Sequence, residues 1–223
     1  MDYQITKFLN QFAGRSRQLD SLAEFMSDKA LPHAVLFMTA FWLIWFRETK
    51  GEHRIRLVMG VGAVVLSGVV SRLLQVALPF RERPIRDAGL HLIVPIGVSP
   101  HTLSGHSSFP SDTAAWLFAL ATLIWFNDRR LGVLAFMLAA VEGLSRIYLG
   151  YHWPSDIAAG AALGAFLVTL AQLLPIPKIA HHILQWERNA TASFYALAFL
   201  VSYLVATLFD EVRTIAGIIA NHL

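Results

Sequence analysis

The sequence contains no cysteine among its 223 residues, which excludes disulfides and thiolate metal sites. Charge is scarce too: Asp, Glu, Lys and Arg make up 15% of the chain, and the formal net charge is only +3. No dense run of Lys and Arg is present, so nucleic acid is not an expected partner. Low-complexity linkers and internal repeats are absent as well, so residues 1–223 are expected to form a single domain.

Apolar residues are what the chain has in excess, at 56% of the total, and whole segments carry no charge. Uncharged apolar runs that approach about 20 residues are typical of transmembrane helices. We therefore predict an all-α, polytopic membrane helix bundle with about six transmembrane helices. The segments are Leu31–Phe46, Leu57–Ser71, Thr113–Phe126, Leu131–Val141, Ile157–Leu174 and Ser193–Phe209.

Residues 1–29 lack the apolar core of a signal peptide, so we expect neither cleavage nor a soluble secreted product. Their apolar residues recur at helical spacing, first at Ile5, Phe8 and Phe12 and then at Leu19 and Leu22. This pattern predicts an amphipathic helix that lies on the membrane surface.

Basic residues suggest which side of the membrane each turn occupies. Six alternating helices place the turns around residues 47–56, 127–131 and 175–192 on one side, and these turns are rich in Lys and Arg. The positive-inside rule makes that side cytoplasmic. The opposite side also carries arginines, so the rule discriminates only if those have another role. With that condition, we predict a cytoplasmic (inner) membrane protein whose residues 80–111 and 145–156 lie on the extracytoplasmic face.

The unusual polar residues all fall on this second face. Ionisable groups at the ends of membrane helices are costly unless they are paired, hydrated or used, so they are functional candidates. His152 and Asp156 begin a helix four residues apart, where the carboxylate can hold one imidazole nitrogen and leave the other free. Arg83 and Arg146 offer planar donors for an anionic oxygen, and Ser111 begins another helix, whose N-terminus favours an anion. Together these residues predict a phosphate site with a nucleophile.

Structural roles are the alternative for several of these residues. Ser111 and Asp112 are also good helix caps, which would not exclude phosphate binding. Glu142 stands four residues before Arg146, so an ion pair that orients the arginine is expected. His106 lies in a loop, where a solvated side chain is the simpler interpretation, and Arg83 could instead extend to lipid headgroups.

The stretch SRIYLGYHWPSD, residues 145–156, fits the spacing S-R-x5-H-x3-D without a mismatch. It resembles the third signature of the type 2 phosphatidic acid phosphatase family. Arg83-Pro84 resembles the end of the first signature, K-x6-R-P, and residues 108–113 (SFPSDT) resemble the second, P-S-G-H. The likeness runs from about residue 57 to 174, and the opening DYQITKFLNQFAG is similar to the bacterial undecaprenyl pyrophosphate phosphatase branch.

The resemblance implies a role for each matching residue. His152 attacks phosphorus to give a phosphohistidine, Asp156 orients it, and Arg83, Arg146 and Ser111 hold the phosphoryl oxygens, with Asp112 beside them. The family uses no metal and no cofactor, and its partner is a lipid phosphate or diphosphate in the bilayer. A haloperoxidase, the family's other activity, is not expected of an embedded chain.

Two positions depart from the family pattern. Val76 stands where the first signature has lysine, and Arg72 or Arg81 would have to supply that cation from a different spacing. Thr113 stands where the second signature has the histidine that protonates the leaving group, and threonine cannot do this. His101 or His106 could take the role instead.

The missing acid bears on the substrate, because a lipid monophosphate leaves more easily than an alkoxide. We therefore predict a lipid phosphatase that converts undecaprenyl diphosphate to the monophosphate. Two alternatives stay open. One is a phosphatidic acid or phosphatidylglycerophosphate phosphatase, or a lipid phosphotransferase, using the same site. The other is a non-catalytic membrane protein that binds lipid diphosphates.

Overall fold

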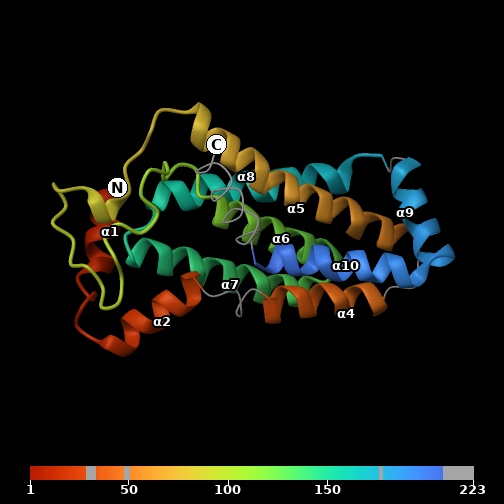
Figure 1. The fold of residues 1–223 in the computed structure, drawn as a ribbon, viewed down its shortest axis with the longest axis horizontal. Coiled ribbons are helices and arrows are strands. Elements are labelled where there is room, and N and C mark those ends of the chain that lie inside the picture. Colours follow the sequence, from red (N-terminus) through yellow and green to blue (C-terminus); the bar gives the residue numbers. More distant parts are fainter. Residues whose placement is uncertain (29–33, 48–50, 176–177, 208–223) are drawn as a thin grey trace, which may run out of the picture.

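The computed structural model describes residues 1–28, 34–47, 51–175 and 178–207, and within these ranges the chain is helical with no strand. The all-α prediction is confirmed (Figure 1). The helices before the long connection are α1 (Asp2–Asn10), α2 (Arg17–Asp28), the π-helix η1 (Ala34–Met38), α4 (Thr39–Arg47) and α5 (Gly51–Ala77). The later ones are the 3-10 helix η2 (Pro84–Arg86), α6 (Asp112–Asn127), α7 (Arg129–Tyr148), α8 (Pro154–Leu173), α9 (Lys178–Asn189) and α10 (Thr191–Ala206).

All six apolar segments are helical where the structure describes them, but they differ in length. Within the described residues, α5, α7 and α8 are long and apolar enough to cross a membrane, and α9 with α10 makes a fourth candidate, bent by 119°. The apolar helix over Val35–Arg47 is shorter, and α6 has only 16 residues. Judged by length and apolar composition, three or four of the described helices can therefore span a membrane, fewer than the six predicted. Residues 31–33 and 208–209 of the predicted segments lie outside the described ranges.

Helix α6 forms the centre of the bundle, where it packs against α5, α7 and α8. Its alanines at 115, 119 and 121 are buried, and these small side chains let the neighbouring helices approach closely. Two glycines of α8 allow a close approach. A Cβ on Gly160 would lie 2.2 Å from the carbonyl oxygen of Ser111, and one on Gly164 would lie 2.1 Å from that of Ala115. The beginnings of α6 and α8 are thus held together.

The N-terminal segment is two helices, and not the single helix expected over 1–29. The chain turns at Gly14, which has a positive φ of 70°, and the carboxylate of Asp20 accepts the Gly14 amide. Both helices are amphipathic, and their apolar faces point outward. Phe8 is 62% exposed and Leu22 is 57% exposed, whereas the polar Asn10 is buried. The polar side of this helix pair therefore contacts the protein.

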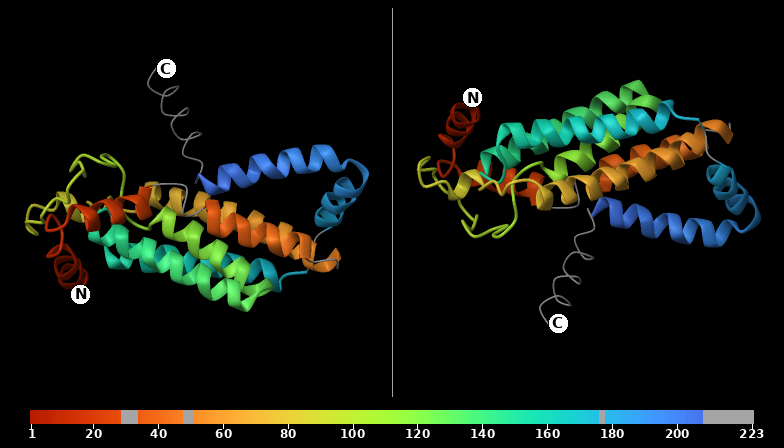
Figure 2. Two further views of the ribbon diagram at one scale, coloured as in Figure 1. Left: turned by 90° about the horizontal axis from the view of Figure 1, so that it is seen from below. Right: turned by 90° about the horizontal axis from the view of Figure 1, so that it is seen from above.

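The two ends of the bundle differ (Figures 1 and 2). Helices α1 and α2, the connection 78–111 and the turn 149–153 gather at one end, and α9 lies at the other. The turns near residues 51–56 and 127–131 lie at the α9 end, as the alternation of helices predicts. Residues 48–50 and 176–177 of the predicted basic turns lie outside the described ranges.

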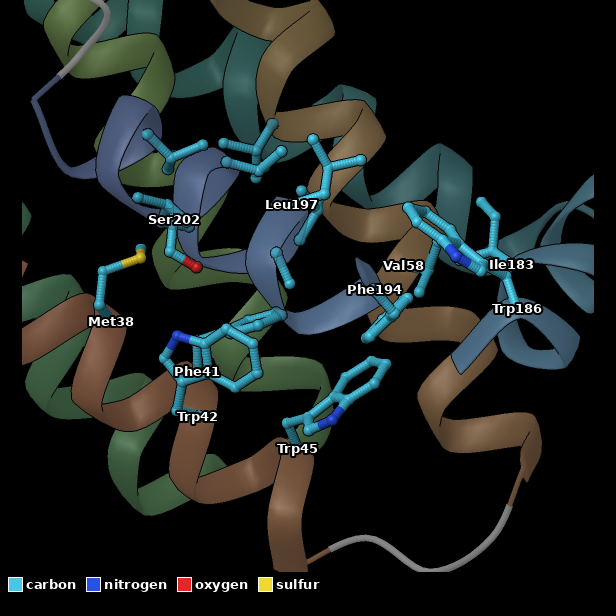
Figure 3. A pocket seen from close by; sticks show the side chains of 16 residues that line it. Met38, Phe41, Trp42, Trp45, Val58, Ile183, Trp186, Phe194, Leu197 and Ser202 are labelled. Carbon is cyan, nitrogen blue, oxygen red and sulfur yellow. The ribbon is translucent and has the colours of Figure 1, made fainter. Parts of the chain in front are cut away.

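An apolar pocket lies among α4, α5, α6, α9 and α10 (Figure 3). Its lining consists almost entirely of aliphatic and aromatic side chains, including Phe41, Trp42, Trp186 and Phe194, and Ser202 contributes a hydroxyl group. An isolated phosphate would be poorly solvated there. The polar chemistry of this protein therefore belongs to the other end of the bundle.

Candidate active site

Three segments far apart in the sequence are joined at the α1 end of the bundle. The Ile85 amide donates to the Gly150 carbonyl at 2.9 Å, and the Ser108 amide donates to the Arg81 carbonyl at 2.9 Å. The Ser111 amide donates to the Asp156 carbonyl at 3.1 Å. These backbone bonds bring the three signature-like stretches of the sequence to one place.

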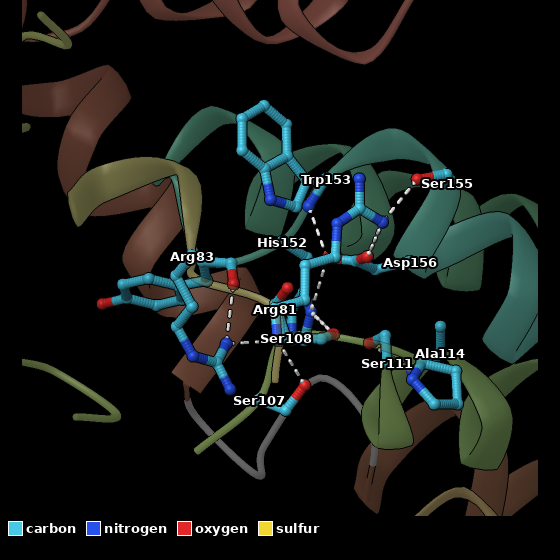
Figure 4. A network of polar contacts seen from close by, with 12 residues as sticks. Arg81, Arg83, Ser107, Ser108, Ser111, Ala114, His152, Trp153, Ser155 and Asp156 are labelled. Atoms are coloured by element: carbon cyan, nitrogen blue, oxygen red, sulfur yellow. Dashed lines mark hydrogen bonds and ion pairs between the residues drawn. The ribbon is translucent and has the colours of Figure 1, made fainter. Parts of the chain in front are cut away.

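His152 is fully buried at the centre of this cluster (Figure 4). Its Nδ1 lies 2.9 Å from the Ser108 carbonyl oxygen, which can only accept, so Nδ1 carries the proton. With the proton on Nδ1, the lone pair of the ring is on Nε2, which accepts a hydrogen bond from Nη1 of Arg83 at 3.4 Å. The arrangement makes Nε2 the nucleophilic atom.

Asp156 is also fully buried, but its contact with the imidazole is longer than the spacing suggested. Its Oδ2 lies 3.6 Å from Nδ1 of His152 and accepts the Trp153 amide at 2.8 Å. Its Oδ1 accepts Nη1 of Arg81 at 2.5 Å. The carboxylate therefore caps α8 and adds negative charge behind the imidazole, while the Ser108 carbonyl provides the direct hydrogen bond.

Arg83 and Arg146 are both buried beside His152, at 4% and 8% exposure. Nη1 of Arg83 donates to the Tyr151 carbonyl at 2.6 Å, and Nη1 of Arg146 donates to the Ser27 carbonyl at 3.1 Å. Each Nε is buried and makes no hydrogen bond within the described part of the chain. Buried donors without an acceptor are costly, so an anion that accepts from them would be stabilised.

Burial, together with the positive charge of these arginines, sets the protonation of the site. Burial, followed by the charges of Arg146 and Arg83, holds the pKa of His152 well below its usual range. Burial and the neighbouring Arg146 lower the pKa of Arg83 to about 10, so it stays charged near neutral pH. A neutral imidazole beside two guanidinium groups suits attack on an anionic phosphorus centre.

The start of α6 provides capping as well as proximity. Ser111 Oγ accepts the Ala114 amide at 3.3 Å, and Asp112 Oδ1 accepts the Thr113 amide at 2.9 Å. The capping roles considered for Ser111 and Asp112 are therefore present. Nearby, the side chain of Ser108 is fully buried between the start of α6 and Asp156.

The auxiliary candidates occupy different places. Arg81 is already engaged by Asp156 and Asp2, so it is not free to replace the family lysine directly. Thr113 is buried in the first turn of α6, and Glu142 is fully buried on α7, one turn before Arg146. His106 is exposed, with Nδ1 3.0 Å from the Ser104 carbonyl. The proposed acid role of His106 stays a prediction.

Several contacting residues were not identified from the sequence. Ser108, Tyr151 and Ser27 act on the site through backbone carbonyls, which no sequence motif marks. Asp2 and Ser155 both contact Arg81 although 153 positions separate them. The third signature specifies no residue type at position 155, so it assigns no role to Ser155. Sequence proximity could have suggested Ser155, which directly precedes Asp156.

These features define a helical bundle with several apolar helices and, at one end, a candidate anion site beside the buried His152. The chain belongs to the PAP2 superfamily, whose sequence profile matches residues 57–176. The family expected from the third signature is thus confirmed.

Similar proteins include two undecaprenyl-diphosphatases. The chain is 27% identical over 170 residues to undecaprenyl-diphosphatase BcrC of Bacillus subtilis, covering 76% of this chain and 79% of that protein. It is 28% identical over 166 residues to the undecaprenyl-diphosphatase of Sulfolobus acidocaldarius, covering 72% and 75% respectively. The fold resembles the crystal structure of a transmembrane PAP2 type phosphatidylglycerolphosphate phosphatase from Bacillus subtilis. That comparison has a TM-score of 0.53 and 18% identity, and it covers 77% of this chain and 82% of the other.

Proposed function

We propose that this protein is a membrane phosphatase that removes the terminal phosphate of a polyprenyl diphosphate, with undecaprenyl diphosphate as the substrate. The observation that carries the proposal is the buried, neutral His152 beside two arginines with unfilled donors. Two relatives are named undecaprenyl-diphosphatases, and the chain is similar to them along most of their length, which supports the choice of substrate.

The reaction requires two displacements at phosphorus. Nε2 of His152 attacks the terminal phosphorus, the bond to the bridging oxygen breaks, and the polyprenyl monophosphate leaves. Water then attacks the phosphohistidine and releases inorganic phosphate, which restores the free imidazole. Arg83 and Arg146 stabilise the charge on the transferred group in both steps, and Nδ1–H keeps its bond to the Ser108 carbonyl throughout.

Thr113 supports a diphosphate over a simple phosphomonoester. Its side chain cannot protonate a leaving alkoxide, and general acid catalysis is typically worth about 10² to 10⁴ in rate. A monophosphate leaving group is a far weaker base, so the absence of a histidine at this position is less damaging. Hydrolysis of phosphatidic acid or phosphatidylglycerophosphate is therefore the less favoured use of the same site.

The location that fits this function is the cytoplasmic membrane, with the cluster around His152 on the extracytoplasmic face. The basic turns at the α9 end support this orientation through the positive-inside rule. The arginines at the opposite end, which counted against the rule, include Arg81, Arg83 and Arg146 with internal partners. Those residues are thus not free to act as topology signals.

Phosphate release by the purified protein in detergent tests the proposal. We expect turnover of undecaprenyl diphosphate by the wild type and by His181→Ala, and no turnover by His152→Ala. His181→Ala is the control, because His181 is exposed on α9 at the opposite end of the bundle. Turnover of phosphatidic acid equal to that of the diphosphate would overturn the substrate assignment. Full activity of His152→Ala would overturn the enzyme mechanism.

A further inference from the structure

The first helix of the chain contacts the catalytic carboxylate through a single arginine. Nη2 of Arg81 donates to Asp2 Oδ2 at 2.7 Å, and Nη1 of the same side chain donates to Asp156 Oδ1 at 2.5 Å. Asp156 in turn lies behind His152. A continuous set of charged groups therefore runs from α1 to the proposed nucleophile.

Ser155 ties this set together. Its hydroxyl donates to Asp2 Oδ2 at 2.5 Å and accepts Nη1 of Arg81 at 2.8 Å, and its amide donates to Asp2 Oδ1 at 3.2 Å. Asp2 thus receives three hydrogen bonds from two residues at the start of α8 and in the long connection. This arrangement fixes the carboxylate of Asp2 far better than a surface ion pair would be fixed.

The guanidinium of Arg81 is also confined by aromatic rings. Its central carbon lies 5.4 Å from the ring centroid of Trp153 and 5.9 Å from that of Phe109. With the rings beside it and a carboxylate on each of its two terminal nitrogens, the group has little freedom to reorient. Loss of the Asp2 charge would therefore act on Asp156 through the unbalanced positive charge of Arg81.

We propose that Asp2 is a positioning residue that acts through Arg81 to set the charge and orientation of Asp156 behind His152. Asp2 shares the positive charge of Arg81, which leaves Asp156 able to support the imidazolium character that develops as Nε2 forms its bond to phosphorus. It also holds the guanidinium on the Oδ1 side, so that Oδ2 stays with the Trp153 amide and the imidazole. This inference rests on the proposed function.

The test is steady-state kinetics of Asp2→Asn with undecaprenyl diphosphate. We expect kcat to fall by about 10-fold, the lower end of the loss seen when a carboxylate behind a functional histidine is removed from metal sites. KM should stay within about 2-fold, because the arginines that hold the substrate phosphate are unchanged. Asp2→Glu keeps the charge and should recover part of kcat.

Tyr3→Phe is the matched control on the same helix. It removes the 2.6 Å bond from the Tyr3 hydroxyl to Asp87, which also anchors α1, but leaves the ring against Trp153. We expect its kcat to equal that of the wild type. Ser155→Ala, which removes one donor to Asp2 while keeping the carboxylate, provides a second variant with an expected smaller loss of kcat.

The outcomes separate this inference from the function on which it rests. Wild-type kcat in Asp2→Asn, with His152→Ala inactive, would overturn the role of Asp2 alone. Equal losses in Asp2→Asn and Tyr3→Phe, or no recovery in Asp2→Glu, would show that α1 only stabilises the fold and would also overturn it. An inactive wild type would instead overturn the proposed function. If Asp2→Asn fails to fold, Ser155→Ala decides, and unchanged kcat there counts against the inference.

Discussion

The protonation of His152 is the most consequential property of any single residue in this protein. With its ring buried and two arginines beside it, the imidazole should be neutral at pH 7. The Ser108 carbonyl keeps the single ring proton on Nδ1. The pKa of His152 in the folded protein lies well below that of an ordinary histidine. Nε2 therefore becomes protonated, and loses its nucleophilic lone pair, only when the pH falls well below the ordinary histidine pKa. Neutral pH therefore leaves Nε2 unprotonated and reactive.

Histidine-selective 15N NMR in detergent can observe this state directly. We predict that the His152 signals, assigned by comparison with His152→Asn, are those of a neutral ring with the proton on Nδ1 at pH 7. A charged His152 ring at pH 7, or a proton on Nε2, would contradict the assigned nucleophilic atom.

Thr113 gives a second prediction at the level of one side chain. Thr113→His should raise kcat for phosphatidic acid by about 10-fold or more, since general acid catalysis becomes available to an alkoxide leaving group. The gain for undecaprenyl diphosphate should be smaller. Thr113→Val, which adds no acid, is the control, and the measurement is phosphate release from both lipids. A larger gain for the diphosphate would argue against the explanation based on the leaving group.

The residues of the site could be predicted only in part from the sequence. His152, Asp156, Arg83 and Arg146 stand out because charges next to apolar runs need a reason, and the structure brings them together. The carbonyl of Ser108 and the carboxylate of Asp2 do not stand out, because each acts through a tertiary contact with a residue at least 44 positions away in the sequence.

At the scale of helices, the close contact of α6 with α8 holds the start of each at the site. A Cβ on Gly160 would collide with the Ser111 carbonyl oxygen. We predict that Gly160→Ala lowers the stability by about 1 to 3 kcal/mol, as overpacking does. It should also reduce phosphate release, because Ser111 and Asp156 are joined by a backbone bond at this point.

Gly62→Ala is the control for this prediction, since a Cβ there meets no atom within 4 Å. Alanine in an open helical position should leave the stability unchanged or raise it by up to about 1 kcal/mol. Thermal unfolding in detergent and phosphate release measure both variants. Equal behaviour of the two alanine variants would show that the α6–α8 contact can relax without consequence.

The helices themselves were largely predictable, because uncharged apolar runs leave few alternatives in a bilayer. Their ends and breaks were less so. The turn at Gly14 depends on a carboxylate six residues away, and α9 turns from α10 by 119° within a stretch that reads as one basic turn. The apolar face of α1 points outward because the polar side chains of Thr6 and Asn10 are buried against the rest of the protein, a tertiary contact that the sequence pattern does not specify.

On the scale of the whole molecule, the proposed orientation places the two ends of the bundle on opposite sides of the membrane. The natural absence of cysteine allows a direct test with single-cysteine variants. We predict that Ser104→Cys, at the end with the His152 cluster, reacts with a membrane-impermeant maleimide on intact cells. Arg130→Cys, in the exposed turn at the other end, should react only after the cells are opened. The reverse pattern would place the site in the cytoplasm.

Transfer of the phosphoryl group to His152 can be detected by stopping the reaction without acid, because phosphohistidine is labile in acid. The purified protein is mixed with undecaprenyl diphosphate labelled with ³²P in the terminal phosphate and stopped within the first turnover. We predict a labelled protein whose phosphate is stable in base, labile in acid and located on the peptide that contains His152. His181→Ala, at the exposed α9 end, should be labelled equally and His152→Ala not at all. Label on any other residue, or turnover without a labelled protein in the first turnover, would contradict the mechanism.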